Sequence, residues 1–277
     1  MEQPQRKPIK IIKSGTVSIC EYLSEVWEYR NLILVFARVD FKLQYVQTRL
    51  NIFWAFLRPL MVLLLFSFVF DRLFQIRELK YPYMLFAFTG LIVWNNFSFM
   101  VNNASGVIVA NQQLVKKMYF PRIILVISKV LISLIEVGIS LILLLGLILL
   151  LKYPLSAHIV FLPVFICVAL IPGCAIAIWL NTLTIRYRDL NHFIPTLVGF
   201  LIWLTPVFYP VTLIPKEYYF LIYLNPLSGI IQGFRWVVLG DTFPSIWFLP
   251  SLLFSLLALI IGIFFFIRSE ASMADHI

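Results

Sequence analysis

Few residues of this 277-residue chain have the types and spacing that catalysis or metal binding requires. No glycine precedes a lysine, so the phosphate-binding loop of nucleotide hydrolases is absent. His158, His192 and His276 lie far apart, without a carboxylate or cysteine at the spacing of metal ligands. No G-x-S-x-G turn offers a nucleophilic serine. We therefore expect no catalytic residue, metal or bound cofactor here, and any use of ATP must occur in another chain.

Three ionisable residues fall inside apolar runs, where a charge is costly. Lys129 and Glu136 share a helix face, but they lie about 10 Å apart along the axis, too far to pair directly. Lys129 is near enough to the inner boundary to extend towards lipid phosphates. Glu136 lies deeper, and it either takes part in a transport pathway or an interhelix contact or forms a satisfied internal hydrogen bond. Arg58, followed by Pro59, is expected to anchor a kink near the inner surface.

Residues 111–122, NQQLVKKMYFPR, form a polar, basic segment between two long apolar runs. Pro121 and the apolar residues after it indicate where the next helix begins. A solvated loop that its lysines hold on the inner side explains the charge of this segment. It does not explain the whole motif.

The composition indicates a membrane protein. The chain is 61% hydrophobic and 13% charged, with 26 Phe and 7 Trp, which argues against an ordinary soluble domain. The net charge of +9 fits Lys and Arg gathered on the cytoplasmic side of a bilayer and does not indicate nucleic-acid binding. Cys20, Cys167 and Cys174 form no evident pair, so we expect neither a disulfide nor zinc.

Six apolar runs approach the roughly 20 residues that a helix needs to cross a bilayer. They are residues 52–70, 84–101, 123–151, 159–185, 193–209 and 245–267. No cleavable signal precedes them, so the first run is expected to act as the insertion signal. With the N-terminus inside, 14 of the 22 Lys and Arg residues fall in inner segments and 6 in outer ones. This bias predicts that both termini are cytoplasmic.

A seventh apolar stretch, within residues 211–240, is interrupted by Pro215, Pro226, Gly229 and Gly233. Neither half is long enough to cross a membrane. We predict a re-entrant pair of short helices that enters from the outer face, over residues 213–239. The alternative is a further span, which would place the C-terminus outside.

An amphipathic helix is predicted before the first span. Apolar residues recur there at helical spacing: Leu32, Phe36, Val39, Leu43, Val46 and Leu50. Arg38, Lys42 and Arg49 lie on a face about 100° away. This pattern is typical of a basic helix in the inner membrane interface. The alternative is a soluble helix packed on a partner domain. The organisation is then a tail and interfacial helix over residues 1–51 and a transmembrane domain over 52–277.

Aromatic residues gather in the first and fifth spans and in the re-entrant stretch. The two span groups are Phe53, Trp54 and Phe56, and Phe200, Trp203, Phe208 and Tyr209. Most are expected to form belts at the membrane interfaces. Aromatic planes also stack on the CH faces of sugars, so a polysaccharide conduit is the second interpretation.

Several motifs, in the same order, resemble the membrane subunits of ABC-2 type polysaccharide exporters, from about Val26 to Ile277. They are LFAFTGLIVWNNF, NQQLVKKMYFPR, LNTLTIRYRDLNHFIP, LTPVFYPVTLIP, LNPLSGIIQGFRWVVLG and the terminal MADHI. The resemblance implies an all-α integral membrane protein with six transmembrane helices, an N-terminal amphipathic interfacial helix and a re-entrant helix pair before the last span. It also implies a homodimer in the inner membrane with two ATP-binding cassette subunits, which bind ATP and Mg²⁺. The cargo would be a lipid-linked polysaccharide such as O-antigen, capsule or teichoic acid.

The resemblance also implies roles for individual residues. ATPase coupling would involve Asn111, Gln112, Lys116, Lys117, Tyr119, Phe120, Pro121 and Arg122, with Arg186, Arg188 and Asp189 in a second loop. The helix with Arg38, Lys42 and Arg49 would meet membrane lipid and receive the lipid head group. The glycan path would be lined by Phe53, Trp54, Phe56, Phe200, Trp203 and Tyr209, and the outer exit would include Pro215, Asn225, Pro226, Gly229 and Gly233.

Three alternatives remain open at this stage. The chain could be an ABC-2 exporter of another substrate: teichoic acid, capsule, lipid or a drug. It could be a membrane-embedded glycan-lipid transferase, although the carboxylates that would act, Asp71 and Glu217, each stand alone. It could be a scaffold protein without a transport role.

Overall fold

The computed structural model describes residues 19–46, 53–69, 80–243 and 245–276, and every regular element in these ranges is a helix. The N-terminal elements are α1 (Ile19–Glu28), α2 (Arg30–Phe41), a π-helical turn (Lys42–Val46) and α3 (Phe53–Ser67). The central elements are α4 (Tyr83–Ala104), α5 (Val107–Ala110), α6 (Gln112–Lys117), α7 (Ile123–Leu150), a 3-10 turn (Ala157–Phe161) and α8 (Leu162–Arg186). The C-terminal elements are α9 (Leu190–Leu204), two 3-10 turns (Val211–Leu213 and Lys216–Tyr218), α10 (Tyr219–Leu224), α11 (Pro226–Leu239) and α12 (Ser245–His276).

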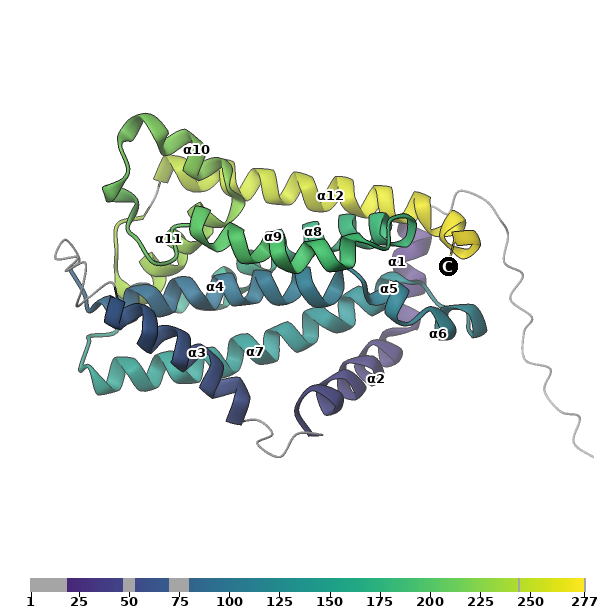
Figure 1. The fold of residues 1–277 in the computed structure, drawn as a ribbon, viewed down its shortest axis with the longest axis horizontal. Helices are drawn as coiled ribbons and strands as arrows, with labels where there is room; N and C mark the ends of the chain where they lie inside the picture. Colours follow the sequence, from purple (N-terminus) through teal and green to yellow (C-terminus); the bar gives the residue numbers. More distant parts are fainter. Residues whose placement is uncertain (1–18, 47–52, 70–79, 244, 277) are drawn as a thin grey trace, which may run out of the picture.

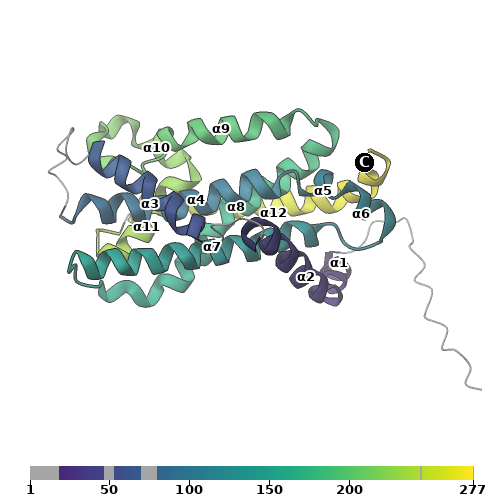
Figure 2. The same ribbon diagram turned by 60° about the horizontal axis from the view of Figure 1, so that its bottom comes forward.

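The long helices α4, α7, α8 and α12 run along the long axis of the molecule (Figure 1), and α9 runs beside them (Figure 2). One end of the bundle carries α1, α5, α6 and the C-terminal end of α12, and we call it the α6 end. The opposite end carries α10 and α11. Tyr22 of α1 and Phe266 of α12 belong to one buried cluster, so the two ends of the described chain meet at the α6 end.

Four helices are long and apolar enough to cross a membrane: Tyr83–Ala104, Ile123–Leu150, Ala157–Arg186 and Phe248–Glu270. They coincide with four of the six predicted spans, which confirms an all-helical membrane protein. In the other two predicted spans, α3 and α9 each have 15 residues. A helix of that length covers about 22 Å, less than the roughly 30 Å of a bilayer core. The count of six spans therefore stays a prediction.

Two stretches differ from the expected boundaries. Helix α1 was not predicted, because it is short and lies in a segment that was interpreted as a polar tail. Helix α12 continues to His276, beyond the end of the apolar run at residue 267. A helix that leaves the apolar region can continue when other elements pack on it, and α1 supplies such contacts through Tyr22.

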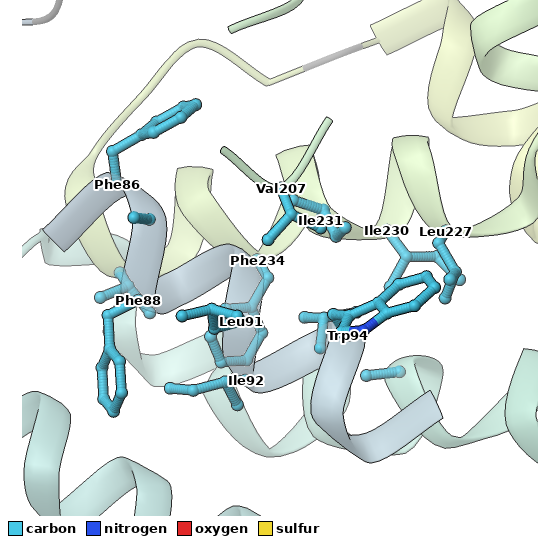
Figure 3. Close-up of a cluster of buried hydrophobic side chains, with 14 of the residues drawn as sticks. Phe86, Phe88, Leu91, Ile92, Trp94, Val207, Leu227, Ile230, Ile231 and Phe234 are labelled. Carbon is cyan, nitrogen blue, oxygen red and sulfur yellow. The ribbon is translucent and has the colours of Figure 1, made fainter. Parts of the chain in front are cut away.

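Helix α4 lies at the centre of the bundle and is buried on almost every side along its first half. Figure 3 shows Leu91, Ile92 and Trp94 of this helix beside side chains of α11 and of the loop after α9, while the Phe86 and Phe88 rings point away in opposite directions. Those neighbours are Val207, Leu227, Ile230, Ile231 and Phe234. A helix that is apolar all round is expected to be buried in this way.

The predicted re-entrant stretch forms two short helices, and the break lies at Asn225 and Pro226. The Asn225 side chain accepts a hydrogen bond from the Leu227 backbone N–H at 3.0 Å and caps α11. Its amide also donates to Thr205 Oγ1 at 2.8 Å, which ties α11 to the loop after α9. Pro215 lies earlier, just before the 3-10 turn Lys216–Tyr218.

Gly229 and Gly233 do not interrupt the helix as the sequence suggested, because α11 runs through both. They allow close packing instead. A Cβ at Gly229 would lie 2.7 Å from Ser251 Oγ and 3.2 Å from the Phe248 Cα atom of α12. A Cβ at Gly233 would collide with the ring of Phe165 in α8. Glycine weakens a helix, but it also lets a neighbouring helix approach closely. The sequence alone does not show which of these two effects matters at a given position.

Arg235 holds α11 to α4 from the inside. The residue is 2% exposed. Its guanidinium lies 3.5 Å from the centre of the Phe86 ring, and Nη2 donates to the Val207 carbonyl oxygen at 2.7 Å. A Cβ at Gly90 of α4 would lie 2.8 Å from the same nitrogen, so a larger residue there would displace the guanidinium. These contacts join α4, α11 and the loop after α9.

The close packing of α11 gives the first prediction. We expect Gly229→Ala to lower thermal stability, because overpacking a core costs roughly 1–3 kcal/mol. The matched control is Gly146→Ala on α7, where a Cβ meets nothing within 4 Å. That change should leave stability unchanged or raise it by up to about 1 kcal/mol through helix propensity. The measurement is the fraction of monodisperse protein that survives heating in detergent. Equal melting temperatures for the two variants would contradict the close packing of α11 against α12 at Gly229.

Candidate functional site

The α6 end presents a basic surface built from two loops. In the first loop, Lys116, Lys117 and Tyr119 are exposed, and no residue of α6 is buried. In the second loop, between α8 and α9, Arg186, Arg188 and Asp189 are exposed. Figure 1 places α5 and α6 at the same end of the molecule as the last turns of α12. The sequence motifs that were predicted to face a partner therefore lie at one end of the molecule and are accessible there.

The two loops also touch each other. A Cβ at Gly106, just before α5, would collide with the Asn191 side chain at the start of α9. The Gly106 position thus needs the smallest residue, because the second loop approaches it so closely. Sequence analysis predicted both loops on one side but could not predict their contact.

The end of the 111–122 motif, from Phe120 onwards, packs into the protein. Phe120 is 4% exposed, and its ring centre lies 5.7 Å from that of Phe36 in α2. Pro121 is also buried, and α7 begins two residues later. Asn111 bonds within its own turn, donating from Nδ2 to the Val107 carbonyl at 2.8 Å, and Gln112 begins α6. The motif thus combines an exposed surface with a buried connection to α2.

Helix α8 holds the turn that leads into α5. Asn181 is fully buried, and its amide donates to the carbonyl oxygens of Ala104 and Ala177. The Thr184 hydroxyl donates to the Ser105 carbonyl at 2.9 Å. The last carbonyl groups of a helix have no partner within that helix, and these bonds supply partners to the carbonyl groups at the end of α4. Sequence analysis did not single out these two residues, although both are polar positions inside an apolar run.

Arg122 connects the start of α7 to the end of α12. Its backbone N–H donates to Glu270 Oε1 at 2.6 Å, and its Nη1 donates to the Glu270 carbonyl at 2.7 Å. The Tyr22 hydroxyl is buried nearby, and this burial together with the Glu270 carboxylate raises the pKa of the tyrosine. Sequence analysis predicted Arg122 as a surface residue for ATPase coupling and did not predict this contact with the C-terminal helix.

A polar pocket of about 610 Å³ lies between α2 with its π-helical turn, α4 and α7. The Lys129 ammonium pairs with Asp40 at 2.7 Å across this pocket. The Lys129 ammonium thus has a carboxylate of α2 as its counter-charge, a partner that the sequence did not predict. Glu136 accepts a hydrogen bond from Gln44 Nε2 at 2.7 Å, which joins α7 to the π-helical turn, and both interpretations of this residue stay predictions.

The predicted amphipathic helix packs on the protein through only part of its surface, and its position in the membrane interface stays a prediction. Ala37 is buried and Asp40 reaches Lys129, whereas Val39 and Leu43 of the stripe are 48% and 53% exposed. The α-helical hydrogen bonding also changes to π-helical from Lys42 onwards. Arg38 and Lys42 are exposed, as predicted, and Arg49 lies outside the described residues.

The aromatic residues predicted for a glycan path lie mainly on open faces of α3 and α9. Phe53, Phe200 and Trp203 are 54%, 68% and 55% exposed. The Trp203 ring centre lies 5.8 Å from that of Phe66, so the two helices meet near their ends at the α10 side.

The remaining members of this set are more enclosed. Phe56 is half-buried, and Tyr209 donates its hydroxyl to the Trp203 carbonyl at 3.2 Å. The side chain of Trp54 lies outside the part that the structure describes. An exposed aromatic face is consistent with a path, with lipid or with a second copy, so the glycan path stays a prediction.

Hydrogen exchange tests whether Asn181 of α8 stabilises the turn before α5. Asn181→Leu leaves buried backbone groups without partners, at a cost of about 1–3 kcal/mol, and should speed exchange in residues 104–111. Thr182→Ala is the matched control on the same helix, because its hydroxyl bonds only within α8. Residues 226–239 should exchange as before in both variants. If Thr182→Ala accelerates exchange in residues 104–111 as much as Asn181→Leu does, Asn181 has no special role.

Comparison with known proteins places this arrangement in a family. The ABC-2 type transporter family matches residues 31–239, which run from α2 to the end of α11. Two O-antigen export system permease proteins RfbA of Klebsiella pneumoniae are 24% and 26% identical to this chain, over 76% and 74% of its length and 82% and 79% of theirs. An O-antigen export system permease protein RfbA of Myxococcus xanthus is 27% identical over 80% of this chain and 85% of its own. Because the family match covers most of the chain, including every element that builds the α6 end except α1 and α12, this protein belongs to the ABC-2 type transporter family.

Proposed function

We propose that this chain is the membrane subunit of an ATP-driven exporter that moves a lipid-linked polysaccharide of O-antigen type across the inner membrane. The observation that carries the proposal is the exposed basic surface at the α6 end of a chain whose sequence has no phosphate-binding loop. An exporter of this kind needs a partner that hydrolyses ATP, with Mg²⁺, and a surface on which that partner docks. The names of the three relatives support the substrate class.

The membrane topology that fits this function has six spans, with α3 and α9 as the short ones. The α6 end faces the cytoplasm together with both termini, since the lysines and arginines of the inner segments gather there. Helices α10 and α11 then form the re-entrant pair at the outer face, where Asn225 and Pro226 make the break and α11 is buried by its neighbours. This division leaves residues 1–51 at the inner surface and 52–277 in the membrane domain.

Two copies of the chain form the exporter in this proposal. Helices α3 and α9, with the turn just after α3, carry apolar side chains that are 44–68% exposed: Phe53, Met61, Leu64, Leu65, Phe68, Phe193, Leu197, Phe200 and Leu204. A two-fold axis beside these helices would bring four aromatic-bearing helices around one conduit. A bundle whose core is as filled as that around α4 has no room for a polymer inside one subunit.

Coupling runs from the docking surface into three helices. Phe120 contacts α2 through Phe36, Arg122 contacts α12 through Glu270, and the turn before α5 is held by Asn181 of α8. A push on α6 by an ATPase is therefore transmitted to helices on several sides of the bundle. Packed helices with discrete arrangements respond to such a push by switching between states.

The docking surface can be tested by charge reversal. We expect Lys116→Glu with Lys117→Glu to lower polysaccharide export by about tenfold or more, because the reversed charges repel the partner's docking surface. A tenfold change corresponds to roughly 1.4 kcal/mol. Lys216→Glu, at the α10 end, is the matched control. The measurement is surface polysaccharide in cells that lack the native gene, with the co-purified ATPase quantified in parallel. Normal export by the double variant would remove the docking assignment.

Gene deletion tests the substrate class itself. Cells without the chain should accumulate the lipid-linked polysaccharide inside and lose it from the surface. Accumulation of a teichoic acid, a capsule precursor, a lipid or a drug instead would assign the chain to another ABC-2 substrate. An unchanged envelope would contradict the proposed function.

A further inference from the structure

Helix α4 carries a polar face where a membrane-spanning helix should have none. Asn95, Asn102 and Asn103 are exposed, and Ser98 is half-buried, although α4 qualifies as a membrane span. Asn95 lies near the middle of this 22-residue helix. Asn102 and Asn103 each donate one hydrogen bond within α4, to Ser98 Oγ at 3.1 Å and to the Phe99 carbonyl at 3.0 Å. Their remaining polar atoms would be costly against hydrocarbon, so this face suits water, protein or a polar ligand.

The polar face forms one wall of the pocket between α2, α4 and α7. Asp40 and Gln44 form the opposite wall, and Lys129 and Glu136 come from α7. The volume of about 610 Å³ lies within the usual range of sites for small molecules, roughly 300–1,000 Å³. Space for a ligand and a polar lining thus occur together at membrane depth.

The charges of the pocket argue against a phosphate. Among the described lining residues, Lys129 is the one cation, and it already pairs with Asp40 at 2.7 Å. Glu136 adds a second carboxylate, which accepts a hydrogen bond from Gln44. A phosphate group would meet more negative than positive charge, and it would have to displace Asp40 to reach the ammonium.

The chemistry of the lining suits a sugar instead. Asparagine and glutamine amides both donate and accept, and carboxylates accept, which matches the hydroxyl groups of a carbohydrate. Phe99 adds an apolar ring to the same wall, and a ring can lie against the CH face of a sugar. A neutral hydroxyl-rich ligand satisfies these groups without introducing a charge.

We propose that the pocket between α2, α4 and α7 binds an uncharged, hydroxyl-rich segment of the glycan during export. The inference rests on the proposed function and adds to it a binding site away from the aromatic faces of α3 and α9. The pocket also joins α2 to α7 through Asp40 and Lys129, so an occupant lies against the helix that Phe36 links to the docking surface. Glycan binding in the pocket and coupling to the ATPase therefore both involve α2.

Photo-cross-linking tests the site directly. A benzophenone amino acid replaces Asn102 in the full chain, in cells that make the polysaccharide and carry the ATPase partner. The control position is Leu257 of α12, which is 56% exposed and does not line the pocket. After irradiation, the purified chain is probed for covalently bound glycan by periodate oxidation and hydrazide labelling.

The expected result is a glycan adduct at position 102, with none at position 257 and none when polysaccharide synthesis is blocked. A phospholipid adduct alone at position 102 would assign the pocket to a lipid head group and overturn the proposal. So would an absence of adduct at position 102 in cells whose export is intact. Gene deletion tests the exporter function independently. A negative cross-linking result therefore contradicts the binding site and not the exporter function.

A pair of variants gives a second measurement. Asn95→Leu with Asn102→Leu should lower export by about tenfold, the effect of losing roughly 1.4 kcal/mol of binding. The amide-preserving pair Asn95→Gln with Asn102→Gln is the matched control and should retain most of the export. Both proteins should reach the membrane and co-purify with the ATPase at normal levels, because leucine is favourable in a membrane span. Unchanged export by the leucine pair would show that the amides bind no glycan.

Discussion

Polar groups inside a bilayer have no water to bond, so each must find a partner within the protein or line a wet cavity. Three polar residues of the described bundle bond in this way, although Arg235 Nε is buried without a hydrogen-bond partner. Arg235 bonds to the Val207 carbonyl and lies over the Phe86 ring, Asn225 caps α11, and Asn181 holds the turn after α4. Each of these residues joins segments far apart in sequence. The bonds that satisfy polar groups are therefore also the bonds that fix how the helices are arranged.

The two ends of the bundle differ as a consequence. At the α10 end, α11 is almost entirely buried and glycine admits its neighbours, so this end is closely packed. At the α6 end, a short helix with no buried residue extends from a firmly held turn. A surface of this kind can receive force from a partner, because the exposed helix is small and its attachments lead into long helices. The polar pocket lies between the two ends, beside the ion pair of Asp40 and Lys129.

The long membrane spans could be predicted from the sequence, because the hydropathy of a span depends only on its own residues. The long apolar runs correspond to α4, α7, α8 and α12 within a few residues, and the break at Pro226 lies where expected. The positions of Lys116 and Arg186 at one end follow from charge and from the alternation of successive spans. Contacts between distant residues were beyond this reasoning. The partner of Lys129 is Asp40, and no local pattern distinguishes that carboxylate from lipid phosphate as its counter-charge.

Composition and periodicity by themselves determined that this is an all-helical membrane chain, since hydropathy needs no third dimension. Only the tertiary structure decided what each polar or small residue does. Gly229 admits α12 instead of breaking a helix, and Arg122 bonds to the C-terminal helix. Asn95, Asn102 and Asn103 of α4 face a pocket instead of the core. The physical reason is the same in each case. A residue type sets which bonds and contacts are possible, and the neighbours that folding brings within a few ångströms decide which of them form.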